Sequence, residues 1–185
     1  WDTDVGRGFP GWHVECTAML LQFLGDNVDI HTGGIDLRFP HHEDERAQTN
    51  CVAGHEVVRH WVHAEHLLFE GRKMSKSAGN VVLLSDVVAR GHDPLALRLS
   101  FLQQHYRTQV DLTWETIAAA GRLLRRWRDA VRNGRSASAS TSDSAIDLAV
   151  TTAVQAAFEN DLDTAAAVRV LREFERSSDV PASTK

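Results

Sequence analysis

The first chemical clue in the sequence is a concentration of metal-binding side chains in its first third. Eight of the ten histidines lie between His13 and His66, in the same region as Cys16 and Glu45. On a helix His41 and Glu45 lie four residues apart, so both side chains project from one face and reach one ion. Zinc binds cysteine sulfur, histidine nitrogen and carboxylate oxygen together, usually in sets of four. The pattern indicates a zinc site with three ligands, Cys16, His41 and Glu45.

Spacing alone leaves other interpretations open. A polar helix rich in histidine is often only a solvated face, and Cys16 can serve as a small buried apolar residue. His13, His42 and Glu43 are nearly equal candidates for ligands on the same basis. Cys16 and Cys51 are too few to staple a chain of this size, so free thiols or a metal site are expected instead of a disulfide framework.

A second segment able to do chemistry lies at residues 71–80, Gly-Arg-Lys-Met-Ser-Lys-Ser-Ala-Gly-Asn. Two lysines, Lys73 and Lys76, and two serines lie between glycines, so one loop offers several ammonium and hydroxyl donors. Such donors suit a triphosphate and stabilise the charge that develops as pyrophosphate leaves. The alternative is an exposed basic turn, and the residues by themselves leave both interpretations open.

The elements that must position these residues change in kind along the chain. Glycine and proline punctuate the first 40 residues, and helices dominate after residue 84. Strands and helices followed by helices alone predict an α/β layer and then a helical bundle, with a boundary near residues 80–110. The expected helices are 12–24, 41–50, 84–88, 95–104, 113–132 and 146–174, the expected strands are 27–31 and 67–69, and a flexible Ser-rich connection is expected at 133–144.

Composition limits the classes of protein that fit. With 185 residues, 43% of them hydrophobic, the chain can bury one sizeable core. No stretch approaches the length of a membrane helix and the first residues do not resemble a signal peptide, so a cytoplasmic protein is expected. The net charge of −5 argues against nonspecific coating of nucleic acid, but six arginines lie between residues 121 and 135 against the single acid Asp129.

Four segments carry a resemblance to a known family. Lys73-Met74-Ser75-Lys76-Ser77 matches the KMSKS signature of class I aminoacyl-tRNA synthetases letter for letter. Residues 10–16, 31–37 and 39–45 (Pro-Gly-Trp-His-Val-Glu-Cys, His-Thr-Gly-Gly-Ile-Asp-Leu and Phe-Pro-His-His-Glu-Asp-Glu) resemble, in order and spacing, the zinc and active-site segments of cysteinyl-tRNA synthetase. The resemblance implies part of a Rossmann-like nucleotide-binding catalytic domain over 1–110, then an α-helical bundle segment over 111–185.

The resemblance also implies a metal centre and an amino-acid pocket. The zinc ligands of the family fall on Cys16, His41 and Glu45, with one Zn²⁺ per chain. In that family the ion binds the thiolate of the substrate cysteine, which rejects serine because oxygen is a poorer partner and its hydroxyl stays protonated. Trp12 falls where the family has an aromatic wall of the pocket.

Nucleotide contacts are implied in the same way. Gly33, Gly34 and Asp36 fall on the segment that approaches ATP, where glycines permit close backbone contact and Asp36 is a candidate hydrogen-bond acceptor for ribose. Lys76 matches the lysine that contacts ATP, and Lys73 is its helper. We expect both lysines to be catalytic.

The implied reaction has two steps and three small or macromolecular partners: ATP with Mg²⁺, L-cysteine and tRNA(Cys). Cysteine attacks the α-phosphorus of ATP to give cysteinyl-adenylate and pyrophosphate, and the terminal ribose hydroxyl of the tRNA then takes the cysteinyl group. The sequence lacks the His-x-Gly-His element of the family and the cysteine that precedes it. We therefore expect a fragment or truncated homologue that needs a separate N-terminal half, with an exposed sheet edge where that half packs, and no membrane partner.

Three other functions fit parts of the same pattern. A ligase that joins cysteine to an amino sugar in mycothiol synthesis shares several of these segments, although Glu45 and Ala47-Gln48 favour the tRNA enzyme. A non-catalytic binding module is the second, with the arginine-rich helix touching a tRNA backbone. A remnant without function is the third, and the intact motifs argue against it.

Overall fold

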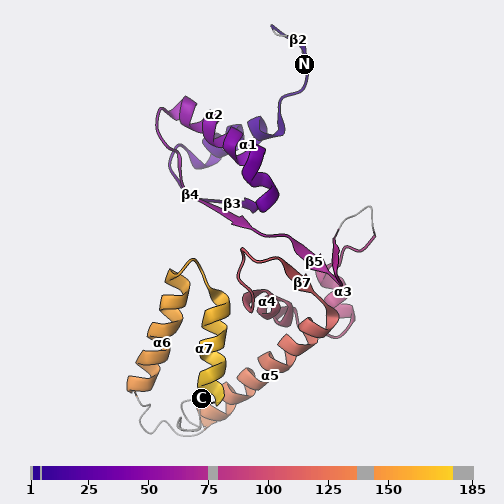
Figure 1. The fold of residues 1–185 in the computed structure, drawn as a ribbon, viewed down its shortest axis with the longest axis vertical. Helices are drawn as coiled ribbons and strands as arrows, with labels where there is room; N and C mark the ends of the chain where they lie inside the picture. The colour runs from indigo at the N-terminus through magenta and orange to yellow at the C-terminus, as the bar shows by residue number, and fades with distance from the viewer. Residues whose placement is uncertain (1, 5, 75–78, 137–143, 177–185) are drawn as a thin grey trace. The chain divides into compact units, whose positions relative to one another are not determined.

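The structure is a computed structural model that describes residues 2–4, 6–74, 79–136 and 144–176 (Figure 1). The chain divides into two compact units, Trp1–Glu65 and His66–Lys185. Both strands and helices are present, as the sequence predicts, and no helix within the described ranges is long and apolar enough to cross a bilayer.

The first unit is built around a parallel strand pair joined by a crossover helix. Strand β3 (Val28–Gly34) pairs in parallel with β4 (Val58–Ala64), and helix α2 (Glu43–Ala53) connects them. Parallel strands need such a crossover, because a tight turn can join only antiparallel strands. Helix α1 (Trp12–Leu24) packs on α2. A small apolar core holds the unit together, made of Leu20, Val28, Val57 and Val58.

Irregular segments complete this unit. Strands β1 (Asp2–Thr3) and β2 (Gly6–Arg7) form a short antiparallel pair. A 3-10 turn over Ile35–Leu37 and a wide helical turn over Arg38–His42 lead from β3 into α2. Among the described residues β3 and β4 pair only with each other, which leaves one edge of each strand without a partner strand in these ranges.

The second unit combines a three-stranded sheet with five helices. The sheet order is β6-β5-β7, in which β5 (Leu67–Phe69) lies between β6 (Arg72–Lys73) and β7 (Val110–Leu112). Side chains from the sheet and from three helices form its core: Phe69, Val87, Ala96, Leu112 and Ile117. The described helices are α3 (Leu84–Ala89), α4 (Pro94–Leu102), α5 (Trp114–Ser136), α6 (Ser144–Glu159) and α7 (Thr164–Arg176).

Local chemistry explains where these helices start and which face they bury. Asp93 caps α4, since the Leu95 amide donates to its carboxylate at 2.8 Å, and Pro94 occupies the first helical position. In α5 the positions Ile117, Ala120 and Leu123 recur every three residues and are almost fully buried. Five arginines of α5 are exposed and lie outside this apolar stripe: Arg122, Arg125, Arg126, Arg128 and Arg132.

The sequence prediction of one helix over 146–174 is wrong. The chain reverses between α6 and α7, which lie side by side (Figure 1). Asp161 and Leu162 adopt left-handed backbone angles (φ of 54° and 55°), which end a right-handed helix. The apolar spacing continues across this turn, so periodicity concealed it. Residues 133–136 of the predicted connection belong to α5, and 137–143 lie outside the described residues.

Asp161 holds this reversal against the loop before β7. Its carboxylate accepts hydrogen bonds from the Tyr106 hydroxyl and from Arg107 Nε, both at 2.6 Å. These bonds, first the one from Arg107, lower the pKa of Asp161 from 3.8 to about 2. A carboxyl group whose pKa is lowered by folding stabilises the folded state above its unfolded pKa, and this contribution is lost as the pH falls from about 4 towards 2.

We therefore expect Asp161→Asn to lower the urea midpoint of the second unit at pH 6, and the difference from the unaltered chain to shrink as the pH falls from about 4 towards 2. Urea unfolding followed by circular dichroism at a series of pH values measures this difference. A difference that stays constant down to pH 2 would contradict the assignment of the stabilisation to the ionised carboxylate. Asp163→Asn, two residues away, is a control for the charge change.

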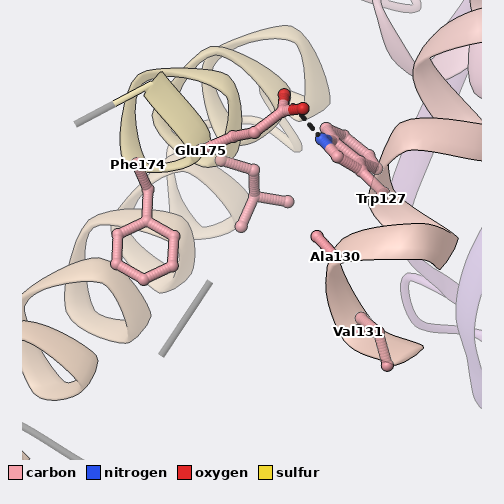
Figure 2. Close-up of a pocket in the computed structure, with 6 residues that line it drawn as sticks. Trp127, Ala130, Val131, Phe174 and Glu175 are labelled. Carbon is pink, nitrogen blue, oxygen red and sulfur yellow. Dashed lines mark hydrogen bonds between the residues drawn. The ribbon is translucent and has the colours of Figure 1, made fainter. Parts of the chain in front are cut away.

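A hollow of about 230 Å³ lies between α5 and α7 and is mostly apolar. Figure 2 shows Trp127 donating a hydrogen bond from its indole nitrogen to Glu175 Oε2 at 3.2 Å, beside Ala130, Val131 and Phe174. Glu175 also accepts from Arg126, so its carboxylate is used within the bundle. The other lining residues are apolar, so the hollow belongs to the packing of the bundle.

Candidate functional site

The structure brings the three predicted zinc ligands together. Cys16 comes from α1, His41 from the wide turn before α2, and Glu45 from the first turn of α2. One donor atom from each, the thiol sulfur, a ring nitrogen and a carboxylate oxygen, lies within 4.8 Å of the others. Both His41 and Glu45 are buried, with exposed fractions of 8% and 1%. The arrangement is a compact donor set contributed by two helices and the turn between strand and helix.

Glu45 is the most unusual member of this set. His41 Nε2 lies 2.6 Å from Glu45 Oε1, and yet both carboxylate oxygens are buried without a hydrogen bond. The His41 ring is thus close to Glu45, but it is not oriented to donate an N–H to the carboxylate oxygen. Burying a carboxylate without hydrogen bonds is costly, and burial raises the pKa of Glu45 to about 7. A cation between these donors would satisfy the carboxylate, so the residues present fit a zinc ion.

In the metal-free protein the Cys16 side chain favours its protonated thiol form. Burial raises the pKa of its thiol, and the Glu45 and Glu15 carboxylates raise it further. Metal binding must displace this proton, because the thiolate is the ligand. Of the other ligand candidates, Glu43 is exposed and His13 lies 3.5 Å from Asp44, whereas His42 lies near Glu45 in a second group of donors.

A second histidine group adjoins the first. His31, His42 and Glu45 also place donor atoms within 4.8 Å of one another. His42 Nδ1 and His63 Nε2 share a hydrogen bond at 2.8 Å, and the His31 ring stacks on Trp61 at 4.6 Å between centroids. Burial, followed by the neighbouring histidine charges, lowers the pKa of His31 and brings that of His42 to about 4. Both rings are therefore neutral at pH 7 and able to act as hydrogen-bond partners or ligands.

Trp12 and the glycines of β3 lie around this cluster. The Trp12 ring is 4.3 Å from the His41 ring and is 63% exposed, so it borders the donor set with one face open. A Cβ atom at Gly33 would come within 2.5 Å of the His42 ring, so glycine is required there by the packing of His42. Asp36 follows in the 3-10 turn, and its carboxylate lies against Gly34.

The KMSKS lysines belong to the other unit. Lys73 lies in β6, opposite Leu68 of β5, and its carbonyl accepts a hydrogen bond from the Asn80 side chain at 3.1 Å. Asn80 thus links the two ends of the segment. Lys76 lies outside the described residues.

Comparison with known proteins identifies the family. A family described as the catalytic domain of class I (C) tRNA synthetases matches residues 1–122. The chain belongs to this synthetase family. The resemblance that the four sequence segments carry is therefore confirmed.

Curated relatives of this synthetase family chain are cysteine–tRNA ligases. Those of Thermus thermophilus and Opitutus terrae are 46% and 45% identical over 181 and 174 residues, covering 94% and 92% of this chain. The ligase of Paracoccus denitrificans is 43% identical over 182 residues and 98% of the chain. The chain spans 37%, 36% and 37% of the lengths of these three relatives.

A solved synthetase structure matches the fold. The LeuRS of Agrobacterium radiobacter, in a ternary complex with tRNA and LeuAMS, superposes with a TM-score of 0.65 over 84% of this chain and 24% of that chain. At 22% sequence identity this likeness concerns the class I fold alone.

Within this synthetase chain, sequence reasoning missed two of the residues that the fold gathers at the donor set. His31 was placed only within a glycine-rich nucleotide segment, and His63 was given no role. The parallel register pairs Gly33 with His63 and Thr32 with Val62, and it brings the ends of β3 and β4 to the same side as His42. The sequence shows that histidines are clustered in this region. Only the pairing of β3 with β4 shows that His31 and His63 are the ones that lie beside His42.

Proposed function

We propose that this chain is the part of a cysteine–tRNA ligase that holds the substrate cysteine and supplies the KMSKS lysines. The observation that carries the proposal is the convergence of Cys16, His41 and Glu45 within 4.8 Å, bordered by Trp12. Family membership and the identity of 43–46% to cysteine–tRNA ligases support it. The complete reaction is proposed from relatives of which this chain spans about a third, and it places the protein in the cytoplasm, where tRNA is charged.

In this proposal Cys16, His41 and Glu45 hold one Zn²⁺. Bound there, zinc supplies a position that takes a thiolate in preference to a hydroxyl, which separates cysteine from serine. His41 and Glu45 are rigidly placed by burial, and Trp12 limits the space beside them. His31 and His42, uncharged at neutral pH, surround the carboxylate without adding positive charge that would repel the ion.

The remaining site residues act on ATP and its Mg²⁺. Gly33 and Gly34 lie on the segment proposed to approach the nucleotide through its backbone, since the His42 ring and the Asp36 carboxylate occupy the space where their Cβ atoms would be. Asp36 is proposed to accept a hydrogen bond from ribose. Lys76, assisted by Lys73, neutralises the charge that develops as pyrophosphate leaves. Positioning and charge stabilisation account for the chemistry, because the cysteine carboxylate itself is the nucleophile at the α-phosphorus.

The tRNA partner is proposed to meet α5. Arg126 and Arg128 are engaged with Glu175 and Asp93. Arg122 and Arg125 are exposed, lie three residues apart on one side of the helix, and form no ion pair with any described residue. Exposed guanidinium groups at this spacing suit contacts with successive phosphates.

We expect the double change Arg122→Glu, Arg125→Glu to weaken binding of tRNA(Cys) and to reduce the slope of log affinity against log salt by about 2, one for each lost phosphate contact. Filter binding at several salt concentrations measures the slope. The matched control is Arg169→Glu, Arg172→Glu, which makes the same change in charge at the same spacing on α7. Equal losses in both double variants would mean that net charge, and not this face of α5, governs binding.

The proposal is tested by measuring zinc content and cysteine-dependent exchange of pyrophosphate into ATP on the purified chain, alone and with a separately expressed N-terminal half. The expected result is about one zinc per chain, and exchange that requires cysteine. Exchange without zinc, or exchange supported equally by serine, would overturn the assignment of the cluster. Transfer to an amino sugar in place of tRNA would identify the mycothiol-type ligase instead.

A further inference from the structure

The turn that leads into Lys73 contains a residue in an uncommon conformation. Strands β5 and β6 are joined by a two-residue turn, Glu70-Gly71, since Phe69 pairs with Arg72. Both turn residues have positive φ, 49° for Glu70 and 74° for Gly71. Glycine, asparagine and aspartate are the usual residues of such turns, whereas a longer side chain is disfavoured in the left-handed region. A glutamate held there needs a compensating interaction elsewhere.

The compensation comes from the segment that begins α5. Glu70 Oε1 accepts a hydrogen bond at 3.1 Å from the backbone amide of Trp114, the first residue of α5. The Glu70 amide donates to the Leu112 carbonyl at 3.0 Å, and the Gly71 amide donates to Asp111 Oδ1 at 2.9 Å. Both residues of the turn are thus bonded to β7 and to the first residue of α5, about 40 positions further along the sequence.

Ring contacts strengthen the same junction. The Trp114 ring meets Phe69 of β5 edge to face, with 5.2 Å between the ring centroids. The Arg90 guanidinium lies over the same ring, 4.1 Å from its centroid. The His92 ring stacks on Trp114 with 6.0 Å between the ring centroids. The start of α5 is therefore fixed from the α3–α4 connection as well, and provides a firm support for the turn.

We infer that Glu70 is a positioning residue, which ties the β5–β6 turn to the start of α5 and so fixes the strand that carries Lys73. Only Gly71 and Arg72 separate Glu70 from Lys73, so the path of β6 is set by this turn. The carboxylate acts as an acceptor for the exposed amide of the helix, where a negative charge is also favourable. The catalytic role of Lys73 rests on the proposed function. The contact between the β5–β6 turn and the start of α5 does not depend on it.

The tie is tested with two variants of the chain. Glu70→Asn keeps a residue that favours the left-handed turn but is one methylene too short to reach Trp114. Glu70→Gln is the matched control, because it keeps both the reach and an acceptor oxygen. Arg72 pairs with Phe69 next to the turn, so its amide donates to the Phe69 carbonyl, and the Trp114 amide donates to Glu70. By hydrogen exchange, we expect the amides of Arg72 and Trp114 to exchange about tenfold faster in Glu70→Asn and at nearly the unaltered rate in Glu70→Gln.

Kinetics separate positioning from a purely structural role. In pyrophosphate exchange with the N-terminal half present, we expect Glu70→Asn to lower kcat about fivefold to tenfold with the KM for cysteine unchanged, and Glu70→Gln to keep nearly the unaltered kcat. Unaltered exchange of the Arg72 amide in Glu70→Asn, or equal defects in both variants, would overturn the tie. Faster amide exchange with unchanged kcat would overturn the positioning role. If the unaltered chain together with the N-terminal half shows no cysteine-dependent exchange, the proposed function fails, and the amide exchange still decides the tie.

Discussion

Replacing Cys16 with serine is expected to abolish stoichiometric zinc binding. The hydroxyl that replaces the thiol stays protonated at neutral pH and is a poor zinc ligand, so only His41 and Glu45 would remain of the three predicted donors. We expect less than about a tenth of the zinc found in the unaltered chain after dialysis, measured by inductively coupled plasma mass spectrometry.

Cys51→Ser is the matched control for this change. Cys51 is an exposed thiol on α2 and belongs to neither group of candidate metal-binding side chains among the described residues. Its replacement is expected to leave the zinc content unaltered. Full zinc in Cys16→Ser, or an equal loss in both variants, would remove Cys16 from the ligand set.

Truncation of Ile117 to alanine is expected to produce the largest loss of stability in the second unit. Ile117 is fully buried, and its side chain fills the centre of a cluster shared by the sheet and the helices α3, α4 and α5. Removing three buried carbon atoms from such a site costs about 2–5 kcal/mol, through lost transfer free energy and the remaining cavity. Chemical denaturation followed by circular dichroism measures the free energy of unfolding.

Val88→Ala provides the comparison for Ile117→Ala. Val88 lies on α3 next to the buried Val87, but its side chain is 52% exposed, so we expect a loss of less than about 1 kcal/mol. Similar losses for the two variants would mean that the core of this unit is not packed around Ile117.

Local patterns predict those elements whose ends are marked by local chemistry. The expected bounds of α1 and β5 agree with the structure, since Gly11 and Gly25 flank the helix and the turn Glu70-Gly71 follows the strand. The helix at α5 is found one residue from its expected start, where Thr113 and Thr116 exchange capping hydrogen bonds. The donor set of Cys16, His41 and Glu45 also converges, because the wide turn that carries His41 runs directly into α2 and the four-residue spacing still brings His41 next to Glu45.

Long-range pairing and tertiary contacts determine the features that the sequence did not predict. Strand β3 extends to Gly34, beyond the expected 27–31, because it pairs with β4 as far as Ala64. The reversal at Asp161 depends on hydrogen bonds from Tyr106 and Arg107, more than 50 residues earlier in the chain. Neither partner can be recognised from the residues around Asp161. The domain boundary predicted at 110 and the roles of the ATP-binding residues remain predictions.

The buried Glu45 carboxylate, which accepts no hydrogen bond, lowers the stability of the first unit when no metal is bound, and its role is therefore functional. Burial raises the pKa of this carboxyl group to about 7, and neither of its oxygens accepts a hydrogen bond from a described residue, although the His31 and His41 rings lie close to them. An apolar residue of similar volume, as in Glu45→Met, should therefore make the metal-free chain harder to unfold while destroying its donor set. Selection for folding alone would not keep a glutamate at this position.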